Sequence, residues 1–320
     1  MEFNLLIANI TNPTLLFFLL GIFATFIKSD LEIPTEVSKF IALYLLFAIG
    51  FKGGQELSHS VFEYEIIYTL AAAVLSAAIV PIFTFFIVKR KMPIADSGAI
   101  AAAYGSVSAV TFITAIAFLE SQKIAFGGHM VAILALMEAP AIIVGVALIT
   151  KYKESSEKHI SMSETIKHSF TNGSVLMIMG SLVIGFIAEE KQAQGIRPFT
   201  DDIFKGFLAI FLLDMGIITA QRFAAFRKYG IYAFSIAILL PLLNGSIMSY
   251  LTQFFITEDG NRLLFTILTA SASYIAVPAA MRLAAPDADP GLYIPMALGI
   301  TFPFNITLGM PLFYTMIKYF

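Results

Sequence analysis

Ten apolar segments of membrane-crossing length run along this chain, separated by short polar stretches. A helix needs about 17 to 25 mostly apolar residues to cross a bilayer. The segments lie at 13–28, 36–52, 66–88, 94–119, 127–150, 174–188, 202–220, 229–256, 262–285 and 291–318. Because a helix satisfies its own backbone N–H and C=O groups in hydrocarbon, the sequence predicts an all-α polytopic membrane protein with ten transmembrane helices.

Composition agrees with a membrane protein and excludes several function classes. Charged residues make up 13% of the chain, against about 25% in soluble domains. The net charge is −2 without a clustered basic face, so no nucleic-acid partner is expected. Cysteine is absent, which removes thiol catalysis and cysteine-bound metals. No Walker loop, dinucleotide fingerprint or nucleophile elbow occurs, so neither an enzyme nor an organic cofactor is predicted.

Matching landmarks indicate an internal repeat. Residues in the first half recur in the second at offsets of 160 to 166: Asn12 and Asn172, Gly50 and Gly216, Pro81 and Pro241, Ser106 and Ser108 with Ser271 and Ser273, Pro140 and Pro303. The polar connector 152–170 separates a first repeat, 1–151, from a second, 171–320. Since each repeat holds an odd number of spans, the second must insert the other way up. This inverted 5+5 arrangement is typical of secondary transporters.

The distribution of basic residues predicts the orientation. With the N-terminus outside, twelve Lys and Arg fall in cytoplasmic loops and six on the opposite side. Cytoplasmic loops carry the excess of positive charge in membrane proteins. Both termini are therefore expected outside, in the periplasm, with the connector in the cytoplasm of a cell inner (plasma) membrane protein.

Small hydroxyl residues interrupt the fourth and ninth segments. Polar backbone is tolerated at membrane depth only where it lines a cavity or a ligand, so both segments are predicted to be broken helices. The N-termini of half-helices present free N–H groups to an anion. The predicted substrate-binding residues are Gly105, Ser106, Ser108 and Thr111 in the first break and Ser271, Ser273, Tyr274 and Ala276 in the second.

Close helix packing is the alternative explanation for each break. Small residues let helices approach one another, and Ser or Thr can bond to carbonyls of their own helix. One such motif alone would favour that explanation. Its occurrence at matching places in both halves favours a binding site.

Two acids lie deep within apolar segments. A carboxylate at a helix centre costs about 2.5–3.5 kcal/mol on insertion scales, so such residues are candidates for function. Glu138 and Asp214 are predicted to serve in ion coupling or gating. The alternative for each is a structural hydrogen bond between helices.

Several motifs resemble the sodium-dependent bicarbonate transporter family of cyanobacteria. They are Gly50-Phe-Lys-Gly-Gly54, Val107-Ser-Ala-Val-Thr111 with Leu119-Glu120-Ser121, Met137-Glu-Ala-Pro-Ala141, and Ala270-Ser-Ala-Ser-Tyr-Ile-Ala-Val-Pro278 with Met281-Arg282 and Pro286. The resemblance extends over essentially the whole chain. It implies a core domain that carries both broken helices, a gate domain made of the first two spans of each half, an elevator motion and a homotrimer.

The resemblance also implies ligands and a partner, with departures from the family pattern. A sodium ion could lie at Ser108, Thr111, Glu138 and Ser273, but Tyr274 stands where the family has an acid. Ile218 occupies the family's acidic position in the seventh span, and Asp214 lies one turn earlier on the same face. The family's PII-like regulatory protein is a candidate partner, although the connector is short here.

These observations predict a secondary transporter of a small anion, bicarbonate above all, coupled to sodium through an elevator mechanism. Transport of another small anion or an organic carboxylate is one alternative. A channel or a membrane sensor that does not transport is the other.

Overall fold

The structure is a computed structural model that describes residues 7, 9, 11–59, 64–152, 167, 171, 173–226 and 229–320. Most of the predicted connector 152–170, and Asn172 of the repeat, lie outside the described residues. Within the described part, every regular element is a helix. This confirms the all-α prediction, and the apolar helices identify a multi-pass membrane protein.

The elements follow the predicted segments closely. The first part of the chain contains α2 (Pro13–Phe26), α3 (Thr35–His59), α4 (Tyr64–Val88), α5 (Ile94–Gly105), α6 (Ala109–Ser121) and α7 (His129–Tyr152). The second contains α9 (Gly173–Ile187), α10 (Glu190–Arg197), η1 (Pro198–Asp202), α11 (Phe204–Phe226), α12 (Gly230–Leu251), η3 (Thr252–Phe254), α13 (Asp259–Ala270), α14 (Ala276–Ala284), α15 (Pro290–Pro295), η4 (Met296–Thr301), α16 (Phe302–Phe304), η5 (Asn305–Gly309) and α17 (Met310–Tyr319).

Among the described residues, helices occur at all ten predicted positions, and seven helical segments have the length and composition of a span. These are Thr35–His59, Tyr64–Val88, Ile94–Ser121, His129–Tyr152, Glu190–Phe223, Gly230–Phe254 and Pro290–Tyr319. Helices α2 and α9 are apolar but shorter. The ninth predicted segment is divided between α13 and α14, which are 12 and 9 residues long.

Local chemistry explains several helix boundaries. Asn12 caps α2 by accepting a hydrogen bond from the Thr14 N–H at 3.0 Å, and Pro13 follows at the first helical position. Proline suits that position because an N–H group there would have no partner within the helix, so its absence costs no hydrogen bond. The last segment is instead irregular, with π-helical turns at η4 and η5 between Pro295, Pro303 and Pro311. Each proline removes a helical donor, which favours such local changes of hydrogen-bond pattern.

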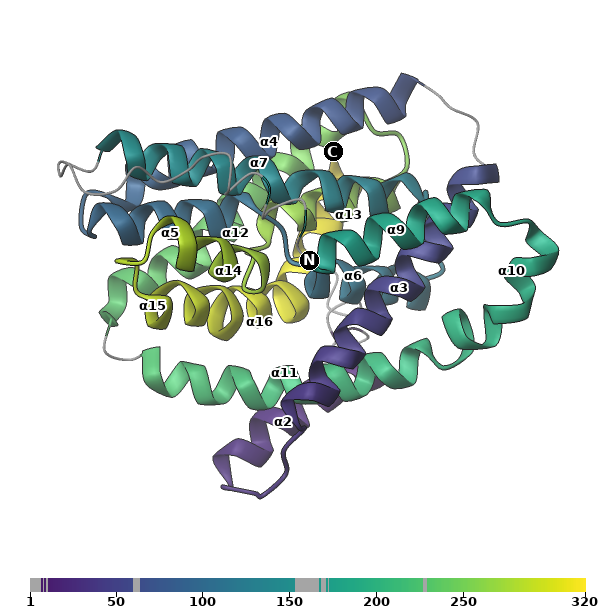
Figure 1. Ribbon diagram of the computed structural model, residues 1–320, viewed down its shortest axis with the longest axis horizontal. Helices are drawn as coiled ribbons and strands as arrows, with labels where there is room; N and C mark the ends of the chain where they lie inside the picture. The colour runs from purple at the N-terminus through teal and green to yellow at the C-terminus, as the bar shows by residue number, and fades with distance from the viewer. Residues whose placement is uncertain are drawn as a thin grey trace.

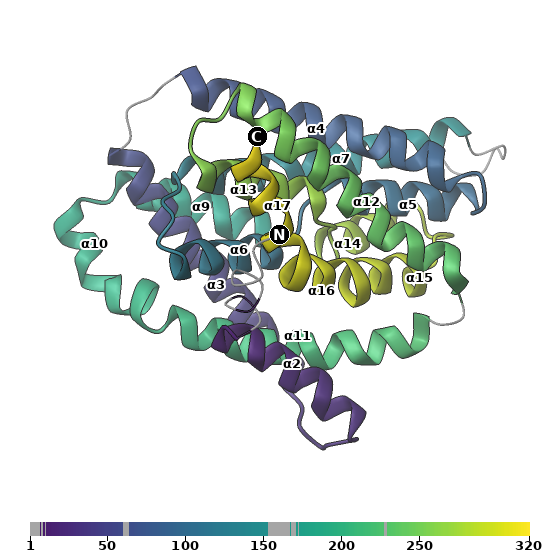
Figure 2. The ribbon, with the colours of Figure 1, turned by 180° about the vertical axis from the view of Figure 1, so that it is seen from behind.

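The helices pack as two groups. The first group consists of α2, α3, α9 and α11, with α2 against α11 and α3 against α9. The second group consists of α4–α7 and α12–α17, in which α4, α5 and α7 pack together and α12 packs on α13. Figures 1 and 2 show α2 and α11 along one side of the molecule and α4 and α7 along the other, with α3 running obliquely from the side of α2 and α11. The two broken segments therefore lie within one group and face the other.

Candidate functional site

The first break separates α5 from α6. Helix α5 ends at Gly105, and Ser106 continues in extended backbone with φ −81° and ψ −179°. Ser108 then caps α6, because its hydroxyl accepts a hydrogen bond from the Thr111 N–H at 3.2 Å. Serine is among the preferred residues at this position. The serines that interrupt the apolar segment thus end one helix and start the next.

The second break crosses the first and is hydrogen-bonded to it. The Ser271 hydroxyl accepts from the Ser108 N–H at 2.9 Å and donates to the Leu268 carbonyl at 2.8 Å. The Ser273 N–H donates to the Ala103 carbonyl, the end of α5, at 2.8 Å. These bonds satisfy backbone groups that the broken helices would otherwise leave unpaired. The two breaks consequently form one crossing, as a transporter site requires.

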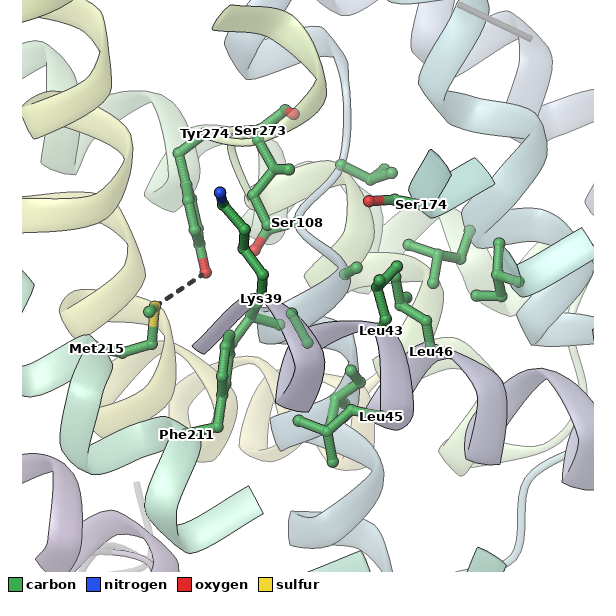
Figure 3. A pocket seen from close by; sticks show the side chains of 18 of the residues that line it. Lys39, Leu43, Leu45, Leu46, Ser108, Ser174, Phe211, Met215, Ser273 and Tyr274 are labelled. Atoms are coloured by element: carbon green, nitrogen blue, oxygen red, sulfur yellow. Dashed lines mark hydrogen bonds between the residues drawn. The ribbon is translucent and has the colours of Figure 1, made fainter. Parts of the chain in front are cut away.

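A cavity of about 430 Å3 lies beside this crossing, between the two helix groups. Its walls come from α3, α9 and α11 on one side and from α6, α7 and the second break on the other (Figure 3). Of the predicted site residues, Ser108, Glu138, Ser273 and Tyr274 line it. Ala109 and Val110, at the N-terminus of α6, also line it. The first N–H groups of a helix have no intrahelical partner, so this end of α6 offers donors to an anion.

The other predicted residues of the breaks support the crossing and are not among the cavity lining. Thr111 and Ser271 are buried and bonded as described. Gly105 packs against Pro81 of α4 so closely that a Cβ would overlap the proline ring. The Ser106 hydroxyl is buried and has no hydrogen-bond partner among the described residues. Ala276 is buried and begins α14.

Tyr274 spans the cavity from the second break toward α11. Its hydroxyl lies 3.9 Å from the Met215 sulfur, and its ring packs edge-on against Phe302 at 6.2 Å. In Figure 3 the ring stands beside Ser108 and points to Met215. Tyr274 therefore connects the broken helix to the other helix group through a polar hydroxyl.

The two predicted acids occupy different surroundings. Glu138 lines the cavity, and its carboxylate makes no hydrogen bond or ion pair with the part of the chain that the structure describes. Asp214 is 4% exposed and accepts a short hydrogen bond from Ser38, which joins α11 to α3. Ser38 itself lines the cavity. Glu138 is thus placed to meet a ligand directly, whereas Asp214 reaches the site through Ser38.

Lys39 is a cavity residue that sequence reasoning missed. It lies in the first turns of α3, where a lysine is expected to mark only the helix end. It belongs to the lining of the cavity, and in the view of Figure 3 its side chain is seen beside Ser108 and Tyr274. Its ammonium is 3.1 Å from the Glu36 carboxylate in an exposed pair. A charged residue within the predicted span 36–52 was the one sequence signal for this role. It could not reveal the cavity, because α9 and α11 also form its walls.

An ion-pair cluster joins the helix groups near the other end of α3. Glu120 of α6 accepts from Lys52 of α3 at 2.9 Å and lies 3.5 Å from Lys205 of α11. A second cavity of about 220 Å3 borders these residues. Two lysines of the first helix group, Lys52 on α3 and Lys205 on α11, thus pair with Glu120 of the second helix group.

The oxygen atoms at the main cavity are of the kind that bind a hard cation such as sodium. Glu138 supplies a carboxylate, and Ser108 and Ser273 supply hydroxyls, which are the hard ligands that such cations take. Thr111, also predicted as a sodium ligand, is buried outside the lining. Among the described residues, no group of three or more His, Cys, Asp or Glu is arranged to hold a metal ion.

Comparison with known families identifies the family to which the chain belongs. The family model of the Na+-dependent bicarbonate transporter superfamily matches residues 13–318. The chain belongs to this superfamily. A comparison with curated proteins gave no match. The superfamily match covers both broken segments and all the predicted site residues, and it agrees with the resemblance seen in the sequence motifs.

Proposed function

We propose that the protein is a secondary active transporter of a small anion, with bicarbonate as the substrate implied by the superfamily and sodium as the coupled cation. The main observation that supports this proposal is that the two broken helices meet beside a cavity. The anion would lie against the N-terminus of α6, with hydroxyls of Ser108, Ser273 and Tyr274 as donors. Sodium would lie at Glu138, where a cation compensates the unpaired carboxylate.

An inverted repeat of five plus five spans, 1–151 and 171–320 around the connector, is part of the proposal. Close helix contacts support it. In α3, Gly54 meets Leu182 and Gly185 of α9, and in α2, Gly21 meets Leu213 and Gly216 of α11, with no room for a Cβ. At offsets of 164 and 162, Gly21 matches Gly185 and Gly54 matches Gly216. The two contacts are therefore equivalent under the repeat.

The direction of two helices also fits ten spans. Gly50 of α3 lies against Ile178 and Ser181 of α9, and Gly54 lies against Leu182 and Gly185, so the two helices run in parallel. In a ten-span chain, α3 and α9 are the second and sixth crossings. Both would then cross in the same direction, as the contacts require.

Alternating access would come from movement of the second helix group, as core, against the first, as gate. The cavity includes residues at the start of α3 and of α9, such as Lys39 and Gly173, which are exposed. In the proposed orientation these ends face the cytoplasm, which would make this arrangement an inward-open state. The proposal also includes placement in the plasma membrane with both termini outside, which the distribution of basic residues supports. Family resemblance supports a homotrimer and a PII-like partner.

Uptake into proteoliposomes tests the proposed function. Radiolabelled bicarbonate should accumulate when an inward sodium gradient is imposed and should not accumulate in protein-free liposomes. Ser108→Ala with Ser273→Ala removes two donors from the site and should abolish accumulation. No accumulation of any tested anion by the native protein, with or without sodium, would refute transport.

A further inference from the structure

The main cavity is larger than a bicarbonate ion needs. Its volume is about 430 Å3, whereas sites for organic ligands span about 300–1,000 Å3. Bicarbonate has a single carbon atom and no apolar body. A ligand that fills this space must extend well beyond the α6 N-terminus.

The walls of the cavity are mainly apolar. Apart from Ser174 and the polar groups already described, the lining consists mainly of aliphatic and aromatic side chains, among them Leu43, Leu46, Ile113, Phe211, Met215 and Ile218. These residues come from α3, α6 and α11, so they surround the space from both helix groups. Such walls favour an apolar ligand surface, since its transfer from water is worth about 25 cal/mol per Å2.

Lys39 and Glu138 are the charged residues of this lining. The side chain of Lys39 is 64% exposed and that of Glu36, its partner, is 83% exposed. Pairs exposed to this degree contribute little and exchange readily. Lys39 can therefore leave Glu36 and bind a ligand carboxylate, while Glu138 faces the coupled cation. One positive charge suits one carboxylate and leaves no partner for a second.

We propose that the cavity binds an amphipathic monocarboxylate, an acid with a branched aliphatic or aromatic body, whose carboxylate pairs with Lys39 and the hydroxyls of Ser108 and Tyr274. The body of the acid lies against Leu43, Leu46 and Phe211. This inference rests on the proposed anion transport and replaces bicarbonate with a larger acid as the substrate of the same site. Lys39 is then the residue that sets the specificity for a single carboxylate.

Binding to the full-length protein in lipid nanodiscs, with sodium present, tests the class. The probes are bicarbonate, acetate, isovalerate, 4-methylvalerate, phenylacetate, succinate and leucine. The affinity of the aliphatic acids should rise about fourfold per added methylene group until the cavity is filled, and succinate should bind more weakly than isovalerate. Bicarbonate as the only ligand would overturn the substrate class and leave the proposed function standing. Leucine bound in preference to every acid would also overturn it, since Glu138 would then hold an ammonium group.

Paired variants test the role of Lys39. Lys39→Gln should weaken the binding of isovalerate and phenylacetate by up to about fivefold, the loss expected for an exposed ion pair, while the gain in affinity per methylene group persists. Glu36→Gln removes the carboxylate that competes for Lys39, so this variant should bind both acids at least as tightly as the native protein does. Equal affinity of Lys39→Gln and the native protein would overturn the assignment. Failure of uptake for all probes, despite binding, would count against transport and not against the ligand class.

Discussion

Glu138 is a carboxylate set against an apolar cavity without a partner among the described residues. If it binds the coupled cation, Glu138→Gln should remove sodium dependence and keep the fold, because the amide has nearly the same volume. Typical coupling between two ligands changes the affinity for one of them by about 5- to 150-fold. In Glu138→Gln, the ratio of substrate affinities with and without sodium should fall to one. Equilibrium binding at two sodium concentrations measures this ratio.

Glu138→Asp is the matched control, since it keeps the charge with a shorter side chain and should retain part of the coupling. The unfolding temperature of Glu138→Gln should equal or exceed that of the native protein, because the substitution breaks no hydrogen bond. A Gln variant with full sodium dependence would place the cation elsewhere.

Asp214 and Ser38 act as a pair between α11 and α3. Removing one partner leaves a buried polar group unsatisfied, which costs about 1–3 kcal/mol. Ser38→Ala and Asp214→Ala should each lower stability, and the double variant should be less destabilised than their sum by about 0.5–3 kcal/mol. Thermal unfolding of the four proteins in detergent gives this coupling. Additive effects would show that the two side chains do not depend on each other.

At the scale of helices, close contact at glycine holds α3 to α9 and α2 to α11. Gly54→Ala and Gly216→Ala place a methyl group against backbone of the neighbouring helix, and such overpacking costs about 1–3 kcal/mol. Both variants should unfold at lower temperature. Gly180→Ala in α9 and Gly206→Ala in α11 are the controls, because no atom lies within 4 Å of the added Cβ.

The control variants should be neutral or more stable by about 0.5–1 kcal/mol, since alanine loses less backbone entropy than glycine in a helix. Equal unfolding temperatures for all four variants would contradict the packing argument. Destabilisation of Gly54→Ala alone would contradict the equivalence of the two contacts under the repeat.

The sequence predicts helices well because membrane length and apolar character are local properties. The serine-rich breaks are also local, since Ser108 caps α6 through a residue three positions away. The polar helix α10 was missed because residues 190–197 have no apolar run. The roles of Lys39 and Glu120 depend on helices far apart in the chain, so no spacing within either helix could reveal them.

At the scale of the whole molecule, the proposed transport mechanism requires the two helix groups to move, and Glu120 bridges them through Lys52 and Lys205. The chain has no cysteine, so Lys52→Cys with Glu120→Cys introduces a unique thiol pair that a short bifunctional maleimide can span. Crosslinking should stop uptake and leave ligand binding intact, because the cavity lies away from this cluster. Glu120→Gln should lower stability by no more than about 1 kcal/mol, since the pairs are partly exposed. Crosslinked protein that transports at the native rate would show that the groups do not move apart here.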